Sequence, residues 1–120
     1  MAEHNETGLA GEKLAKEFLE RKKFKLIETN WRSGRLELDL IAMHDQTLVF
    51  VEVKTRTSNV HGFPEEAVGT AKEAHMAKAA QQYVEQTSWE GEIRFDLISI
   101  TLEGPEAGIH HILDAFFPYE

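Results

Sequence analysis

Apolar and polar residues alternate through the middle of the chain, and apolar residues recur at helical spacing on either side of it. The central segment Leu36–Arg56, LELDLIAMHDQTLVFVEVKTR, is rich in β-branched and aliphatic residues. Such residues suit a pleated and covered surface, so the segment predicts two strands joined by a turn at 44–47. A β-hairpin is therefore expected at the centre of the fold.

The flanking segments complete an α/β pattern. Apolar residues recur every three to four positions before the hairpin, an alanine-rich stretch follows it, and alternating segments come last. The expected elements are a helix over 11–22, strands over 24–31, 36–43 and 48–56, a helix over 65–86 with its main part from Thr70, and strands over 93–102 and 109–113. This order predicts one α/β domain, residues 1–120, with a mixed central β-sheet flanked by helices.

Charged residues stand out on the two central strands. Because side chains alternate along a strand, we expect Glu37 and Asp39 to share one face of the first strand, and Glu52 and Lys54 to share one face of the second. A Glu-x-Lys spacing alone is most often a solvated surface pair. On strands that are otherwise apolar, however, carboxylates are costly to bury unless they neutralise one another or bind a cation. The pattern therefore indicates a metal site.

The expected chemistry follows from these residue types. Mg²⁺ and Mn²⁺ prefer oxygen ligands, and a few carboxylates leave coordination positions for water and a phosphate oxygen. Asp39 and Glu52 come from neighbouring strands and can converge on one ion. Lys54 can hold or help deprotonate an attacking water, or neutralise charge on the phosphate. Together these groups predict a phosphodiester hydrolase.

Composition refines this picture. The chain has 120 residues, no cysteine and a formal net charge of -8, which weighs against nucleic acid as a partner. The acidity is uneven, because residues 85–120 hold one basic and eight acidic residues while residues 1–84 hold twelve basic and thirteen acidic ones. The N-terminal residues lack the basic segment followed by an apolar run that is typical of a signal peptide, and no apolar run reaches membrane length. A cytoplasmic location without membrane contact is expected.

The motif around the hairpin resembles a known nuclease superfamily. Asp39, followed about a dozen residues later by Glu52-Val53-Lys54, resembles the PD-(D/E)XK motif, whose members share a restriction-endonuclease-like αβββαβ core. More narrowly, the chain is similar to the bacterial YraN-type family, itself similar to archaeal Holliday junction resolvases, in Asn30-Trp31-Arg32, Glu37 to Ala42, Phe50 to Arg56, Gly62 and Lys72. The resemblance implies that Asp39 and Glu52 are metal ligands, that Lys54 is catalytic, and that Glu12 adds a carboxylate from the first helix.

Further residues are assigned roles around this site. Glu37 is expected to assist as another metal ligand, and four basic residues are candidate nucleic-acid contacts, with solvated surface charge as the alternative for each: Arg32, Arg35, Arg56 and Lys72. No histidine is assigned a role. His110 and His111 should point to opposite faces of their strand.

The expected function is Mg²⁺- or Mn²⁺-dependent cleavage of DNA, with branched or structured DNA as the substrate class. A homodimer is expected if the resolvase analogy holds, because a resolvase cuts two symmetric strands. One alternative is a nucleic-acid-binding module of the same fold without turnover. Another is a non-enzymatic adaptor that uses the acidic region 85–120 to dock a basic partner.

Overall fold

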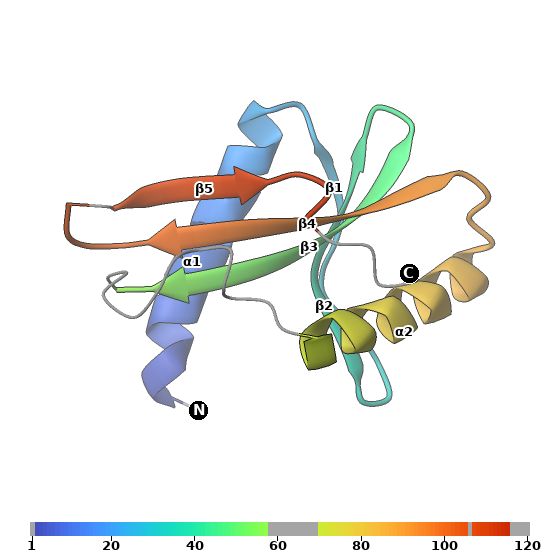
Figure 1. The fold of residues 1–120 in the computed structure, drawn as a ribbon, viewed down its shortest axis with the longest axis horizontal. Helices are drawn as coiled ribbons and strands as arrows, with labels where there is room; N and C mark the ends of the chain where they lie inside the picture. The colour runs from blue at the N-terminus through green and yellow to red at the C-terminus, as the bar shows by residue number, and fades with distance from the viewer. Residues whose placement is uncertain (1, 58–69, 106, 116–120) are drawn as a thin grey trace.

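The computed structural model describes residues 2–57, 70–105 and 107–115, with residues 2–7 and residue 70 described by their backbone alone. The described part of the chain forms, in order, α1 (Ala2–Arg21), β1 (Lys25–Ser33), β2 (Leu36–His44), β3 (Thr47–Arg56), α2 (Thr70–Thr87), β4 (Glu92–Thr101) and β5 (Gly108–Ile112) (Figure 1). The predicted order of helices and strands is confirmed.

The five strands form one mixed sheet. Their order is β1-β2-β3-β4-β5, and β3 and β4 run parallel while the other neighbours are antiparallel. Parallel neighbours need a long crossover, and α2 lies on the crossover between β3 and β4. The predicted mixed central sheet is therefore confirmed.

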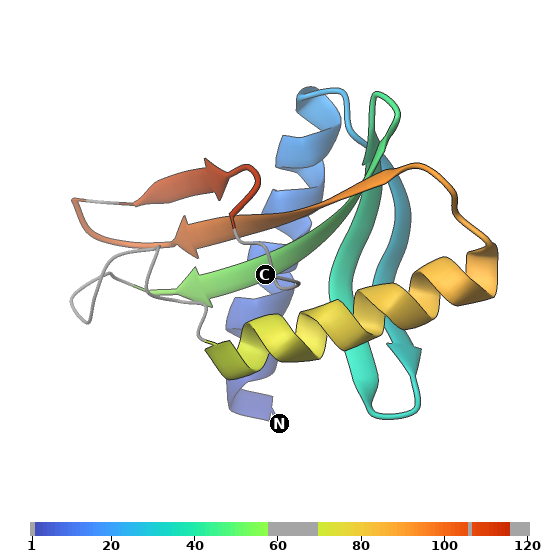
Figure 2. The ribbon, with the colours of Figure 1, turned by 45° about the vertical axis from the view of Figure 1, so that its right-hand side comes forward.

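The two helices cover opposite faces of this sheet. Alternate residues of β3 separate into two clusters: Leu48 and Phe50 pack with α2, whereas Val49 and Val51 pack with α1. Figures 1 and 2 show α1 behind the sheet and α2 in front of it. We call these the α1 face and the α2 face. Both faces of the central strand are apolar over this stretch, as is usual for a strand covered on both sides.

The helix boundaries differ from the predicted ones mainly at the N-terminus. The first helix begins at Ala2 and not at residue 11. The prediction missed its first turns because they are polar and carry little apolar periodicity. The second begins at Thr70, as expected for its main part. The predicted segment 65–69 and most of the loop at 57–64 lie outside the described residues. No helix in the described part of the chain is long and apolar enough to cross a bilayer.

A close backbone approach fixes where α1 crosses the sheet. A Cβ atom built on Gly11 would lie 2.7 Å from Cγ2 of Thr55 in β3. Only glycine leaves room for this contact. It lets α1 lie close to the α1 face, where Ala15 and Leu19 are fully buried.

Candidate active site

The strands β2 and β3 separate next to the two carboxylates of the motif. The two strands are paired from Leu40 and Val51 to the turn that joins them. Just beyond the pair of Leu40 and Val51, Oδ2 of Asp39 accepts a hydrogen bond from the backbone N–H of Val53 at 2.9 Å. The carboxylate thus takes the place of a strand partner for β3. This contact fixes the position of Asp39 beside the residue that follows Glu52.

The regular alternation of β2 reverses at Asp39. Leu38 packs in the cluster on the α2 face, but Leu40, two residues later, packs in the cluster on the α1 face. On the neighbouring strand Asn30 has a positive φ of 51°, which is uncommon for a residue other than glycine. Glu37 and Asp39 therefore do not share a face, and that expectation is wrong.

Glu37 instead lies at the surface. Its carboxylate contacts Nη2 of Arg32 at 3.3 Å, and both side chains are at least half exposed. Its backbone N–H donates to Nε2 of His75 at 3.4 Å. An exposed pair of this kind contributes little to stability.

Glu52 is the buried acid of the site. It is 8% exposed and comes from the same face of β3 as Phe50, which faces α2. Burial, and then the negative charge of the adjacent Asp39, raise the pKa of Glu52 to about 7, while Lys72 opposes this rise. The Nζ atom of Lys72 lies 3.4 Å from Oε2 of Glu52. Two carboxylates from adjacent strands are thus brought together with one ammonium group.

This donor set fits a hard divalent cation. Proteins commonly bind Mg²⁺ through one or two carboxylates and leave the other positions to water and substrate phosphate. The electrostatics agree, because the close approach of Asp39 and Glu52 leaves negative charge that Lys72 offsets only in part. A bound divalent cation would favour the ionised form of both carboxylates.

The other proposed ligands are not gathered with this pair. Glu12 lies in α1, on the α1 face, next to Gly11. Among the residues that the structure describes, no three acidic or histidine side chains are grouped closely enough to hold an ion. Glu12 and Glu37 therefore do not form a three-residue ligand set with Asp39 and Glu52.

Lys54 extends the α2 face beyond Glu52. It is exposed, and the strand register places Ser99 of β4 beside it and His110 of β5 beyond Ser99. The Oγ atom of Ser99 is buried and has no hydrogen-bond partner among the residues that the structure describes. Arg56 follows Lys54 on the same strand face, and Arg35 is exposed after the turn between β1 and β2.

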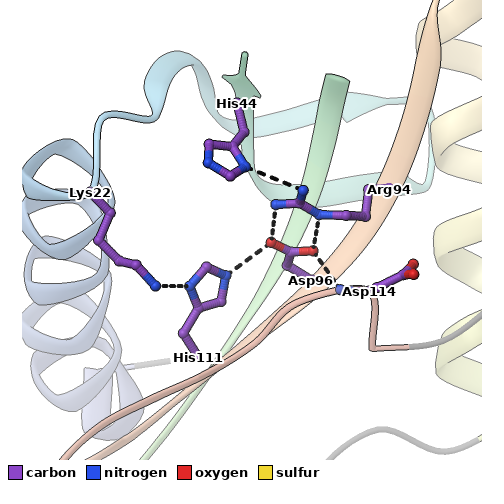
Figure 3. Close-up of polar contacts among 6 residues, drawn as sticks. All are labelled: Lys22, His44, Arg94, Asp96, His111 and Asp114. Atoms are coloured by element: carbon purple, nitrogen blue, oxygen red, sulfur yellow. Dashed lines mark hydrogen bonds and ion pairs between the residues drawn. The ribbon is translucent and has the colours of Figure 1, made fainter. Parts of the chain in front are cut away.

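A second buried carboxylate, Asp96, lies on the α1 face and is surrounded by donors (Figure 3). Arg94 donates to both of its oxygens, from Nε at 2.8 Å and from Nη2 at 2.9 Å. His111 lies 2.9 Å from Oδ2, and the backbone N–H of Asp114 donates to Oδ1 at 3.0 Å. Burial alone would raise the pKa of Asp96, but hydrogen bonds from His111 and Arg94 outweigh it and lower the pKa.

The sequence did not indicate this cluster. Nδ1 of His111 lies 3.2 Å from Nζ of Lys22, and because an ammonium can only donate, Nδ1 accepts and Nε2–H donates to Asp96. Nη1 of Arg94 donates to Nδ1 of His44 at 3.2 Å. His111 thus faces α1 while His110 lies beside Ser99, which confirms that the two histidines point to opposite faces. The contact between His111 and Asp96 could not be predicted from the sequence, because it requires the pairing of β4 with β5.

The element order and the mixed five-stranded sheet between two helices define an α/β protein with a restriction-endonuclease-like core. The chain belongs to the uncharacterised protein family UPF0102, whose model matches residues 11–100. It is 44% identical over 119 residues to the UPF0102 protein of Flavobacterium psychrophilum, covering 99% of this chain and all of that protein. It is 42% identical to that of Bacteroides thetaiotaomicron, over 98% of both chains. The resemblance to the YraN-type family is confirmed.

Proposed function

We propose that this protein is a divalent-cation-dependent nuclease that hydrolyses phosphodiester bonds in DNA. The observation that carries the proposal is the close approach of Asp39 and Glu52 beside the beginning of α2, where burial and the charge of Asp39 raise the pKa of Glu52 to about 7. A buried carboxylate beside a second, half-buried one opposes folding when a cation offsets the charge only in part, unless the two serve a ligand. Mg²⁺ or Mn²⁺ is the ligand that this chemistry favours.

The chain's own residues supply the remaining parts of the reaction. Asp39 is held in place by the Val53 N–H, so its carboxylate stays beside that of Glu52. When bound, the divalent cation would lower the pKa of a water and offset negative charge on the phosphate. Lys54, two residues beyond Glu52 on β3, would orient the attacking water or neutralise the charge that develops on the phosphoryl oxygens. Water forms a bond to phosphorus as the bond to the leaving sugar oxygen breaks.

Basic side chains near this end of the sheet supply contacts for a nucleic-acid backbone. Arg32 and Arg35 lie at the β1–β2 turn. Lys72 lies in the first turn of α2, and Arg56 follows Lys54 on β3. Phosphate contacts of this kind would outweigh the net charge of the whole chain locally. Much of the negative charge comes from residues 85–120, whose buried Asp96 is already neutralised by its own partners.

The four-way junction is the substrate class that the family resemblance favours, and a homodimer would present two such sites to its two symmetric strands. A binding module without turnover is the second candidate, and an adaptor that docks through region 85–120 is the third. The three differ in what they do to DNA, so one set of assays separates them.

The test is incubation of the purified protein with four-way junctions, single strands and duplexes in Mg²⁺ or Mn²⁺. Asp39→Asn is the matched control, because its amide oxygen can still accept the Val53 N–H while the negative charge is lost. Cleavage by the wild type that falls by about 100-fold or more in Asp39→Asn supports the nuclease. Junction binding without cleavage in either protein supports the binding module. Neither binding nor cleavage supports the adaptor.

A further inference from the structure

The ion pair between Lys72 and Glu52 differs from an ordinary surface ion pair. It lies in the first turn of α2, and its ammonium is 3.4 Å from Oε2 of Glu52. Its side chain is 38% exposed, while that of Glu52 is only 11% exposed. A partly solvated cation thus contacts a carboxylate that solvent barely reaches.

The contact is suited to exchange. A single Lys contact at 3.4 Å is long and monodentate, whereas Arg94 grips Asp96 with two donors at 2.8 and 2.9 Å. Lysine carries a compact charge on a flexible stem, so Nζ can move without any movement of the helix. Glu52 is therefore neutralised by a group that can leave.

Lys72 and a divalent cation would compete for the same carboxylate. Both are positive, so placing a cation between Asp39 and Glu52 would create repulsion with an ammonium at its present position. A phosphodiester entering the site brings negative charge, and that charge offers the ammonium a new partner.

We infer that Lys72 is a tethered counter-cation, which holds Glu52 in the metal-free protein and transfers to a substrate phosphate when a divalent cation takes its place. The inference rests on the proposed function and adds a specific role for Lys72. It makes metal binding weaker without nucleic acid than with it. The metal and the substrate thus bind cooperatively, through one side chain that changes partner.

This exchange predicts opposite effects of one substitution. In Lys72→Gln the competing cation is gone, so Mn²⁺ should bind about three- to tenfold more tightly in the absence of DNA. The phosphate contact is gone too, so junction DNA in Ca²⁺ should bind about three- to tenfold more weakly. A purely structural ion pair would not move the two affinities in opposite directions.

The experiment is isothermal titration calorimetry of Mn²⁺ into the wild type, Lys72→Gln, Lys72→Arg and Lys78→Gln, with junction binding measured in Ca²⁺. Lys78 is an exposed lysine on the same helix, so its substitution controls for the loss of one positive charge. The expected result is tighter Mn²⁺ binding and weaker DNA binding in Lys72→Gln alone, with wild-type values in Lys78→Gln. Lys72→Arg keeps the charge and should bind Mn²⁺ no more tightly than the wild type does.

Equal or weaker Mn²⁺ binding by Lys72→Gln overturns the inference, as does the absence of measurable Mn²⁺ binding by both proteins. Tighter binding that appears equally in Lys78→Gln also overturns it, because the effect is then general electrostatics. Failure of the proposed function has a different signature, namely full cleavage by Asp39→Asn, whatever the behaviour of Lys72→Gln.

Discussion

Glu52 and Asp96 are buried carboxylates on neighbouring strands that face opposite sides of one sheet. Asp96 is paired in register with Val51, the residue before Glu52. Asp96 receives two donors from Arg94, one from His111 and one from the backbone of Asp114. Glu52 has Lys72 at 3.4 Å and another carboxylate as its neighbour. The negative charge of a buried carboxylate is thus compensated on the α1 face and only partly compensated on the α2 face.

The difference shows in the direction of the two pKa shifts. Burial raises the pKa of Glu52 to about 7, with Asp39 adding to the rise. Burial also acts on Asp96, but hydrogen bonds from His111 and Arg94 reverse its effect and lower the pKa. A carboxylate whose partners are all supplied by the chain holds the fold together, and one without them is available to a ligand.

Replacing Asp96 should therefore have the largest effect on stability. In Asp96→Asn the guanidinium of Arg94 and the ring of His111 lose their charged partner within a buried site, so the free energy of unfolding should fall by about 3–5 kcal/mol. Urea denaturation at pH 7 measures this, with Glu52→Gln as the matched control on the other face. If Glu52→Gln lost as much stability as Asp96→Asn, the two carboxylates would be equivalent and the contrast would fail.

The second effect is the contribution of Glu52 to the pH dependence of the free energy of unfolding. Between the ordinary glutamate pKa of 4.5 and about 7, the folded protein binds more protons than the unfolded chain, so stability falls as the pH rises. Without divalent metal, wild-type protein should lose about 2–3 kcal/mol relative to Glu52→Gln between pH 4.5 and 8. Urea denaturation of both proteins across this range isolates the contribution of Glu52. Parallel curves would show that Glu52 titrates normally.

A smaller effect tests how tightly the α1 face is sealed. In Gly11→Ala the new methyl group would collide with Thr55, and displacement of α1 should reduce the free energy of unfolding by roughly 1–3 kcal/mol. The matched control is Gly8→Ala on the same helix, where a Cβ atom would meet none of the described atoms within 4 Å. That variant should gain about 0.5–1 kcal/mol from helix propensity. Thermal unfolding of both variants checks the contrast, and two changes of the same sign would refute it.

The sequence predicted the order of the elements and drew attention to Asp39 and Glu52, because apolar alternation and charges on central strands are local signals. It could not predict the reversal of alternation at Asp39, which accompanies a left-handed Asn30 on the neighbouring strand. Glu37 was misplaced for that reason. The start of α1 at Ala2 was missed because polar residues there leave no periodic pattern.

Long-range partners were also beyond the sequence. Lys72 reaches Glu52 only because α2 begins beside β3, twenty positions along the chain from Glu52. His111 reaches Asp96 only through the antiparallel register of β4 and β5, which pairs it with Ile98. Neither contact leaves a trace in spacing or composition. Tertiary placement therefore decided which charged residues are compensated and which are not.

The most direct test of an undercompensated carboxylate is the pKa of Glu52 itself, measured from the ¹³C chemical shift of its side-chain carboxyl carbon in an NMR titration with and without Mg²⁺. A pKa of about 7 is expected in the absence of metal, and saturating Mg²⁺ should lower it by about 1 or more. A pKa near the ordinary value of 4.5 in the metal-free protein, or a raised value that Mg²⁺ leaves unchanged, would contradict the assignment of this pair as a cation site.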